Sequence, residues 1–197
     1  MKNKKLIIIL SLVLVAICVG VGIFFLAPTG TPDPTGPNVS GEVVDYASSV
    51  KLDLSSPYKK QEVTVKLHID GDTVHFNVPH SVNPTGVLKA RFLAVNTPES
   101  TGKIEEWGKA ASKFTRSKLE SAVSIILESD DGRWNIDSTG ERHLVWVWYK
   151  TAEDAEYRNL NIEILQEGYA ISSNASQNRY GTYCTDAIAQ ADRKSVV

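Results

Sequence analysis

The fold is decided by residues 62–78, which read EVTVKLHIDGDTVHFNV. Apolar and polar side chains alternate from Glu62 to Ile69 and again from Val74 to Val78, which is the period of a strand with one buried face. Between the two runs, the segment DGDT at 70–73 breaks the alternation and is typical of a tight turn. The pattern therefore predicts a hairpin or a bent pair of strands.

Beyond this pair, the sequence predicts strands at 87–95, 124–128 and 144–149, and helices at 104–122, 160–167 and 186–194. Trp107, Ala111, Phe114 and Ala122 recur at helical spacing and predict the apolar face of the first helix. Gly168 is well suited to end the second helix. Five short strands with about three helices predict an α+β domain, namely a small β-barrel decorated by helices.

The N-terminus carries a separate signal. Three lysines among the first five residues precede an uncharged apolar run at 6–26, which would be roughly 31 Å long as a helix and could cross a bilayer once. We expect an uncleaved signal anchor at 1–26, with a cleaved secretory signal or a lipoprotein signal as alternatives. In each case the remainder of the chain would be exported, because the positive charges keep the N-terminus cytoplasmic.

Composition shifts suggest further boundaries. Residues 27–41, APTGTPDPTGPNVSG, are rich in proline, glycine and threonine and predict an extended linker. Residues 42–61 are a lead-in of uncertain structure, and residues 62–197 form the predicted folded domain. The whole chain has a net charge of -2, from 21 basic and 23 acidic residues. An acidic balance argues against a protein that coats nucleic acid through a broad basic face.

Four segments carry polar residues that a core does not require, and each has an ordinary structural explanation. The DGDT segment could be only a hairpin turn, and the NTPE segment at 96–99 could be only a connection between a strand and a helix. Arg91 lies in an apolar strand and needs either an anionic partner or access to solvent. Arg142 opens the strand at 144–149. None of the four segments specifies a function alone.

Five stretches together resemble the thermonuclease, or staphylococcal nuclease, family: IDGDTV (69–74), ARFLAVNTPES (90–100), EEWGKAASKFT (105–115), DSTGERHLVWVW (137–148) and NIEILQEGYA (161–170). They occur in the family's order and cover about 63–194. The resemblance implies a five-stranded OB-like barrel and a calcium-dependent enzyme that hydrolyses phosphodiester bonds of DNA or RNA and leaves 3′-phosphates.

The resemblance also implies roles for individual residues. Asp72 matches the family's metal carboxylate, Asn96 stands at a second ligand position, the carbonyl of Thr97 matches a third ligand, and Asp70 lies behind them. Calcium favours such oxygen ligands. Glu99 matches the carboxylate that positions or deprotonates the attacking water. Arg91 and Arg142 match the two arginines that bind the scissile phosphate, so these three residues are the expected catalytic residues.

Three departures from the family pattern bear on activity. Asn96 replaces an aspartate, so one negative charge is lost and weaker calcium binding is expected. Glu141 adds one residue between Gly140 and Arg142. The segment after Gly168, YAISSNAS at 169–176, lacks the tyrosines that family members use there to pack against the bound nucleotide. Base stacking would therefore be weaker or would come from Tyr180 or Tyr183.

The resulting hypothesis is an exported, membrane-anchored, monomeric nuclease that acts on DNA or RNA and needs no obligate protein partner. An alternative is a catalytically weak or silent nuclease-like module that binds nucleic acid. A membrane-anchored protein whose barrel serves only adhesion would explain the anchor and the linker, but it would not explain the cluster of polar residues.

Overall fold

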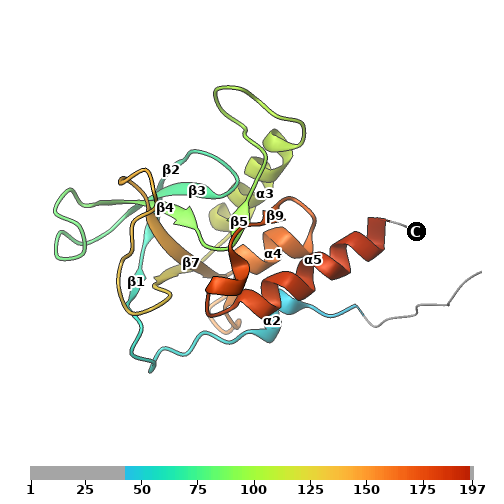
Figure 1. Cartoon of the computed structure of the whole chain (residues 1–197). Coiled ribbons are helices and arrows are strands. Elements are labelled where there is room, and N and C mark those ends of the chain that lie inside the picture. The colour runs from blue at the N-terminus through green and yellow to red at the C-terminus, as the bar shows by residue number, and fades with distance from the viewer. Residues whose placement is uncertain (1–42, 196–197) are drawn as a thin grey trace, which may run out of the picture. The chain divides into compact units, whose positions relative to one another are not determined.

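The computed structural model describes residues 43–195, and the predicted anchor and linker lie outside them (Figure 1). Its strands are β1 (Lys60–Glu62), β2 (Thr64–His68), β3 (Thr73–Asn77), β4 (Val87–Phe92), β5 (Val95–Asn96), β6 (Ser124–Glu128), β7 (His143–Lys150), β8 (Arg158–Asn159) and β9 (Ile171–Ser172). Its helices are α2 (Tyr46–Ser49), α3 (Gly108–Glu120), α4 (Leu160–Gln166), the 3-10 turn η1 (Ala175–Gln177) and α5 (Gly181–Ser195). Within this part of the chain, no helix has the length and apolar character needed to cross a membrane.

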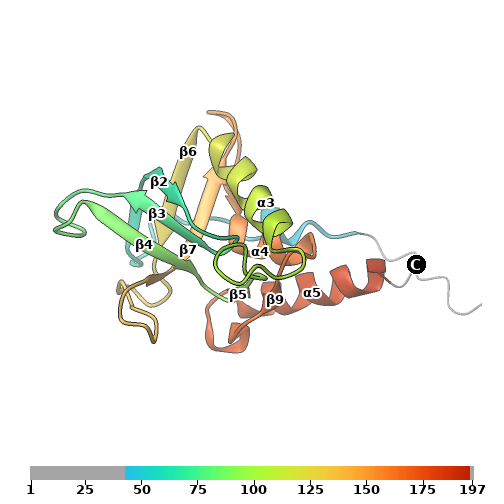
Figure 2. The same ribbon diagram turned by 90° about the horizontal axis from the view of Figure 1, so that it is seen from above.

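Seven strands form one mixed sheet in the order β1-β6-β7-β4-β3-β2, with β8 paired to β7. The β4–β7 pair is parallel, and the other pairs in this sheet are antiparallel. A separate two-stranded sheet joins β5 to β9. In Figure 2 the strands of the large sheet lie on one side of the molecule and α4 and α5 on the other.

The structure has a mixed sheet of several strands instead of the predicted five-stranded OB-like barrel. The two ends of the sheet, β1 and β2, are consecutive in the chain and separated by Val63 alone, yet they pair with β6 and β3 respectively. The amide of Val63 donates to the carbonyl of Ile125 (2.9 Å), so the chain stays beside β6 up to this residue and then bends toward β3. β1 and β2 are not paired with each other, so they are the two ends of the hydrogen-bonded strand order.

Strand β7 and helix α4 supply many of the buried residues of the core. Strand β7 is flanked by β6 and β4, and Val145, Trp146, Val147 and Trp148 have no exposed surface. Burial on both faces explains why this strand is a continuous apolar run rather than an alternating one. Every residue of α4 is buried, and the side chain of Asn159 caps the helix by accepting from the amide of Ile162 (3.1 Å).

The first predicted helix begins later than expected. Helix α3 starts at Gly108 rather than at residue 104, because Trp107 adopts a left-handed conformation with φ of 66°. Trp107 is 69% exposed, so it does not belong to the predicted apolar face, whereas Ala111 is buried and does. The other predicted helices correspond to α4 and to α5, which begins five residues earlier than predicted.

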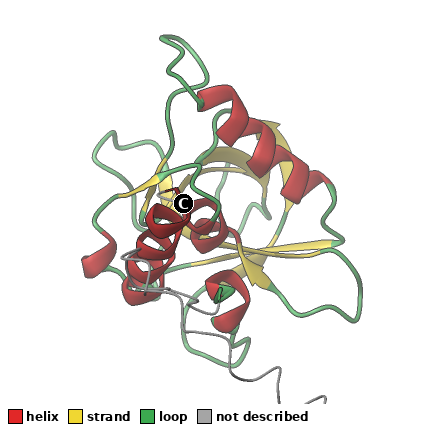
Figure 3. Ribbon diagram, turned by 90° about the vertical axis from the view of Figure 1, so that its right-hand side faces the viewer, coloured by secondary structure: helices red, strands yellow, loops and turns green. Residues whose placement is uncertain are grey.

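The lead-in segment, described from residue 43, is bound to the C-terminal half of the chain by hydrogen bonds and an ion pair. The side-chain oxygen of Gln166 accepts from the amide of Tyr46 (2.7 Å), and Arg158 binds the carboxylate of Asp45 (2.6 Å). The amide of Val44 reaches Gln190 on α5 (2.8 Å). Figure 3 shows the helices in red and the strands in yellow.

Candidate active site

The site forms where the turn between β2 and β3 meets the end of β4 and the segment that leads from β5 to α3. Inside the turn, the amides of Ile69 and Asp70 both donate to the carbonyl of Thr73 (3.1 and 2.9 Å). The amide of Phe92, at the end of β4, donates to the carbonyl of Asp72 (2.9 Å). The DGDT segment is thus a turn, and it is also fixed to the neighbouring strand.

Gly71 lets this turn approach α3 and the β5 connection closely. A methyl group built on Gly71 would lie 2.8 Å from Thr97 Cγ2, 2.9 Å from Thr97 Oγ1 and 3.0 Å from Ala111 Cβ. The hydroxyl of Thr115 donates to the carbonyl of Gly71 (2.6 Å) and ties α3 to the turn. Glycine is therefore required here for space, since no other residue brings its backbone so near to its neighbours.

Asp72 is the buried carboxylate of the site, with 1% of its surface exposed. Its Oδ1 accepts from Arg91 Nη1 and from the hydroxyl of Thr73, and its Oδ2 accepts from the amide of Thr97 (2.9 Å). Burial raises the pKa of Asp72, although Arg91 and the two other donors lower it. The carboxylate therefore depends on these donors for its charge.

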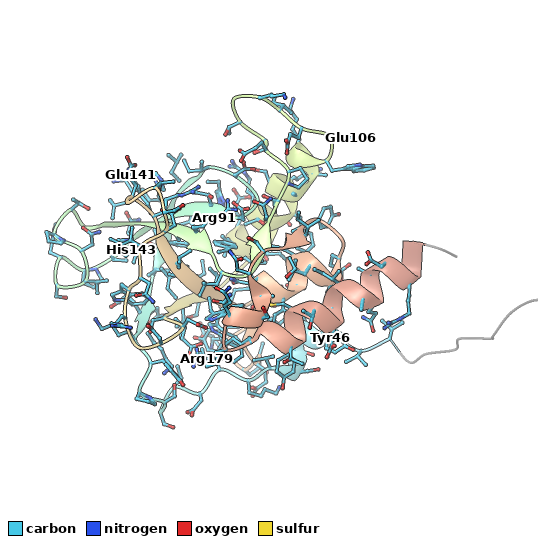
Figure 4. The ribbon with its side chains drawn as sticks, viewed as in Figure 1. Tyr46, Arg91, Glu106, Glu141, His143 and Arg179 are labelled. Atoms are coloured by element: carbon cyan, nitrogen blue, oxygen red, sulfur yellow. The ribbon has the colours of Figure 1, made fainter. Side chains whose placement is uncertain are left out.

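Arg91 spans two of the predicted metal ligands. Its Nη1 binds Asp72, and its Nη2 donates to the side-chain oxygen of Asn96 (2.7 Å). Its side chain is 18% exposed, so the anionic partner that a buried guanidinium requires is Asp72. Figure 4 shows Arg91 near the centre of the molecule.

Glu99 lies at the solvent side of the same cluster. Its backbone is fixed by Glu105, whose carboxylate accepts from the Glu99 amide (3.1 Å) and whose amide donates to the Glu99 carbonyl (2.9 Å). A hydrogen bond to Asp70, partial burial and the charges of Asp70 and Asp72 raise the pKa of Glu99, while Arg91 lowers it. Such a shift is typical of a carboxyl group that exchanges a proton.

Asp70 is buried beside the cluster and binds backbone amides. It is 6% exposed, its Oδ1 accepts from the amide of Gly71 (2.8 Å), and both of its oxygens lie 3.2 Å from the amide of Ser100. It therefore orients the segment that carries Glu99.

Arg142 is not joined to this cluster by any contact in the described part of the chain. Its guanidinium binds the carboxylate of Asp137 through Nε (2.7 Å) and Nη2 (2.6 Å). The β4–β7 register pairs Arg91 with Leu144, which places Arg142 beside β4 but two residues back along the strand. Figure 4 shows its neighbours Glu141 and His143 to one side of Arg91.

The oxygen chemistry of the site fits a hard cation. Asp72 and Asn96 offer side-chain oxygens, and the hydroxyl of Thr97 is buried without a hydrogen-bond partner. Among residues 43–195, however, no three His, Cys, Asp or Glu side chains are grouped so that they could hold a metal. In this arrangement the guanidinium of Arg91 bridges Asp72 and Asn96, so Arg91 would compete with the ion for both ligands.

The two tyrosines considered for base stacking differ. Tyr180 packs edge-on against Trp146 and Trp148 (ring centroids 5.0 and 5.6 Å apart), and its hydroxyl bonds to Glu128. It is therefore half-buried and packed against the core, which makes it unsuited to base stacking. Tyr183 on α5 is 38% exposed.

Sequence reasoning missed Gly108 and Glu105, which position Glu99. A methyl group on Gly108 would lie 2.1 Å from the carbonyl oxygen of Glu99, so α3 begins in direct contact with that residue. The Trp-Gly pair at 107–108 was the available signal, because a glycine that opens a helix indicates a close approach of the backbone. Nothing in the local pattern indicated Asp137 as the partner of Arg142.

A family model described as "Staphylococcal nuclease homologue" matches residues 89–196 of the chain. The match includes Arg91, Asn96, Thr97, Glu99 and Arg142, whereas Asp70 and Asp72 precede it.

Proposed function

The chain belongs to the staphylococcal nuclease homologue family, and from this premise we propose that it is an exported nuclease that hydrolyses phosphodiester bonds of DNA or RNA. The observation that carries this proposal is the cluster in which Arg91 contacts Asp72 and Asn96 beside Glu99. A phosphodiesterase needs a base near the attacking water and fixed positive charge near the phosphate, and this cluster contains both groups.

Each residue has a role in the proposed reaction. Glu99 positions the water and accepts its proton, which suits a carboxyl group whose pKa is raised by Asp70 and partial burial. Arg91 exchanges Asp72 for an oxygen of the scissile phosphate and stabilises the negative charge that develops there. Arg142 would leave Asp137 to bind a second phosphate oxygen. The water oxygen would bond to phosphorus as the P–O5′ bond breaks, so one product would keep a 3′-phosphate and the other would take up a proton and leave with a 5′-hydroxyl.

The proposed cofactor is calcium, held by Asp72, the side-chain oxygen of Asn96 and the carbonyl of Thr97, with Asp70 behind them. The bound cation would add positive charge at the phosphate and lower the pKa of a coordinated water. Because Asn96 contributes no formal charge, we expect the enzyme to need more calcium than it would with aspartate at this position.

The proposed location follows from the sequence. The apolar run at 6–26 would anchor the chain in the membrane, the linker at 27–41 would hold the domain away from the surface, and the nuclease domain would act outside the cell as a monomer. A cleaved signal would instead release it.

One observation favours the alternative of a silent nucleic-acid-binding module. Arg91 already satisfies Asp72 and Asn96 without a metal, and the amide of Asn96 draws a cation less strongly than a carboxylate would. A module that only binds nucleic acid would retain this closed arrangement.

The test is hydrolysis of single-stranded DNA by the full-length chain in non-ionic detergent, with calcium varied from micromolar to tens of millimolar. We expect calcium-dependent cleavage that falls by about 10²-fold or more in Glu99→Gln and saturates at lower calcium in Asn96→Asp. Glu106→Gln is the matched control, because Glu106 is an exposed carboxylate in the same loop (Figure 4). Cleavage only in Asn96→Asp, with the wild type inactive at every calcium concentration, would instead establish the silent module.

A further inference from the structure

A hollow of about 360 Å³ adjoins the candidate active site and has no role in the proposed chemistry. Its polar lining consists of Ser100 and Thr101 from the segment after Glu99, and of Lys109, Ser112, Lys113 and Arg116 from α3. We call this surface the α3 groove. His68 and Ile69, at the end of β2, complete its lining.

The charged side chains of the α3 groove are all cationic. Lys109, Lys113 and Arg116 are spaced four and three residues apart, so they lie along one face of the helix. Lys109 and Lys113 form no ion pair with any residue in the described range, and the pair between Arg116 and Glu120 is long (3.7 Å) and exposed. Like charges at this spacing destabilise a helix, so helix stability does not explain the stripe.

The α3 groove lies next to the candidate active site, because Ser100 belongs to both neighbourhoods. The amide of Ser100 donates to Asp70 (3.2 Å), while the same residue lines the groove. Ser100 directly follows Glu99, the proposed base. The hydroxyls of Ser100, Thr101 and Ser112 are additional hydrogen-bond donors for an anionic ligand.

We propose that the α3 groove binds the phosphate backbone of a single-stranded nucleic acid at nucleotides beyond the scissile bond, an inference that rests on the proposed nuclease function. The charge pattern fits this ligand, because successive phosphates of one strand can meet successive cations along the helix. A flat lipid surface also carries phosphates, but a concave site that borders the segment carrying Glu99 fits a strand better. The groove would therefore give this acidic protein a local basic path for its substrate.

The test compares the full-length wild type with Lys109→Gln/Lys113→Gln and with the control Lys51→Gln/Lys59→Gln. The control removes the same charge from two exposed lysines outside the α3 groove. Binding of a labelled single-stranded 20-mer is measured by fluorescence anisotropy in EDTA over a range of salt concentrations. Cleavage of a dinucleotide, too short to occupy the groove and the active site together, is measured with calcium, and thermal melting checks that each variant is folded.

We expect the groove variant to bind the 20-mer more weakly, with the slope of log Kd against log salt reduced by about 1.4, since each phosphate contact on a single strand contributes about 0.7. Dinucleotide cleavage should stay unchanged, and the control variant should behave as the wild type.

An unchanged slope in the groove variant, or an equal loss in the control, would overturn the proposal. Charge removal that leaves the slope unchanged but weakens binding to nanodiscs containing anionic lipid would assign the groove to a membrane surface. The two proposals fail separately, because a wild type that cleaves neither substrate refutes the nuclease function while the anisotropy still reports on the groove.

Discussion

Replacement of Gly71 by alanine tests whether the close approach of the turn to α3 holds the site together. The backbone of Gly71 is outside the left-handed region, so alanine adds no backbone strain there. Its new methyl group would lie 2.8 Å from Thr97 Cγ2 and 3.0 Å from Ala111 Cβ, closer than such atoms pack. Overpacking of this kind costs about 1–3 kcal/mol, whereas the loss of chain freedom in the unfolded state returns about 0.4–1 kcal/mol.

We therefore expect Gly71→Ala to destabilise the protein by about 1–2 kcal/mol, as measured by urea unfolding at constant m-value. Because Thr97 supplies the amide that binds Asp72, its displacement should also raise the calcium concentration needed for cleavage. Thr97→Ser removes the methyl group that the new side chain would strike. A double-mutant cycle between the two changes should therefore show a favourable coupling of at least about 0.5 kcal/mol. Wild-type stability in Gly71→Ala, or additive effects in the cycle, would refute this reasoning.

Three further predictions concern the fold. Burial raises the pKa of Asp45, but the hydrogen bond and charge of Arg158 outweigh burial and lower the pKa to about 2. This ion pair should therefore stabilise the protein above pH 4 and lose that effect as the pH falls through 2. Asp45→Asn should therefore cost about 1 kcal/mol at pH 7, after allowance for solvent screening, and almost nothing at pH 2 in urea titrations; a cost that is constant with pH would contradict the assignment. Tyr149→Phe should cost about 1–2 kcal/mol, because it removes the buried hydrogen bond from the hydroxyl to Glu163 (2.5 Å), and an unchanged melting temperature would count against that bond. Cys184 is fully buried, and burial raises the pKa of its thiol to about 12. With Cys18 replaced by serine, Cys184 should therefore react with a thiol reagent only at the rate of unfolding. Fast labelling under native conditions would show that the core is open.

Local sequence patterns were sufficient for most elements of the fold. The alternation at 62–69 and 74–78 predicted β2 and β3, and the apolar run at 144–149 predicted β7 to within one residue at each end. Helix α4 was predicted from an apolar segment that ends before Gly168, which has φ of 75°. These features depend on neighbouring residues, so a single sequence contains the necessary information.

The elements that were missed depend on distant partners. Strands β5, β8 and β9 are two residues long and exist only because each pairs with another segment. The bend between β1 and β2 lies at Val63, whose amide donates to the carbonyl of Ile125, a residue far away in the chain. The same reason explains why the exposed position of Trp107 was not anticipated, since the backbone at this residue is shaped by the contact between Glu99 and Gly108.

The sequence by itself determined the family, the order of the main strands and helices, and the identities of the polar residues at the candidate site. Only the tertiary structure decided how those residues are engaged: Arg91 bridges Asp72 and Asn96, whereas Arg142 is held by Asp137 outside the cluster. It also brought Ser100 beside the cations of α3 to form one groove. The physical reason is that residue types and spacing record which groups are available, whereas charges and donors select their partners by distance, which is set only when the strands and helices pack.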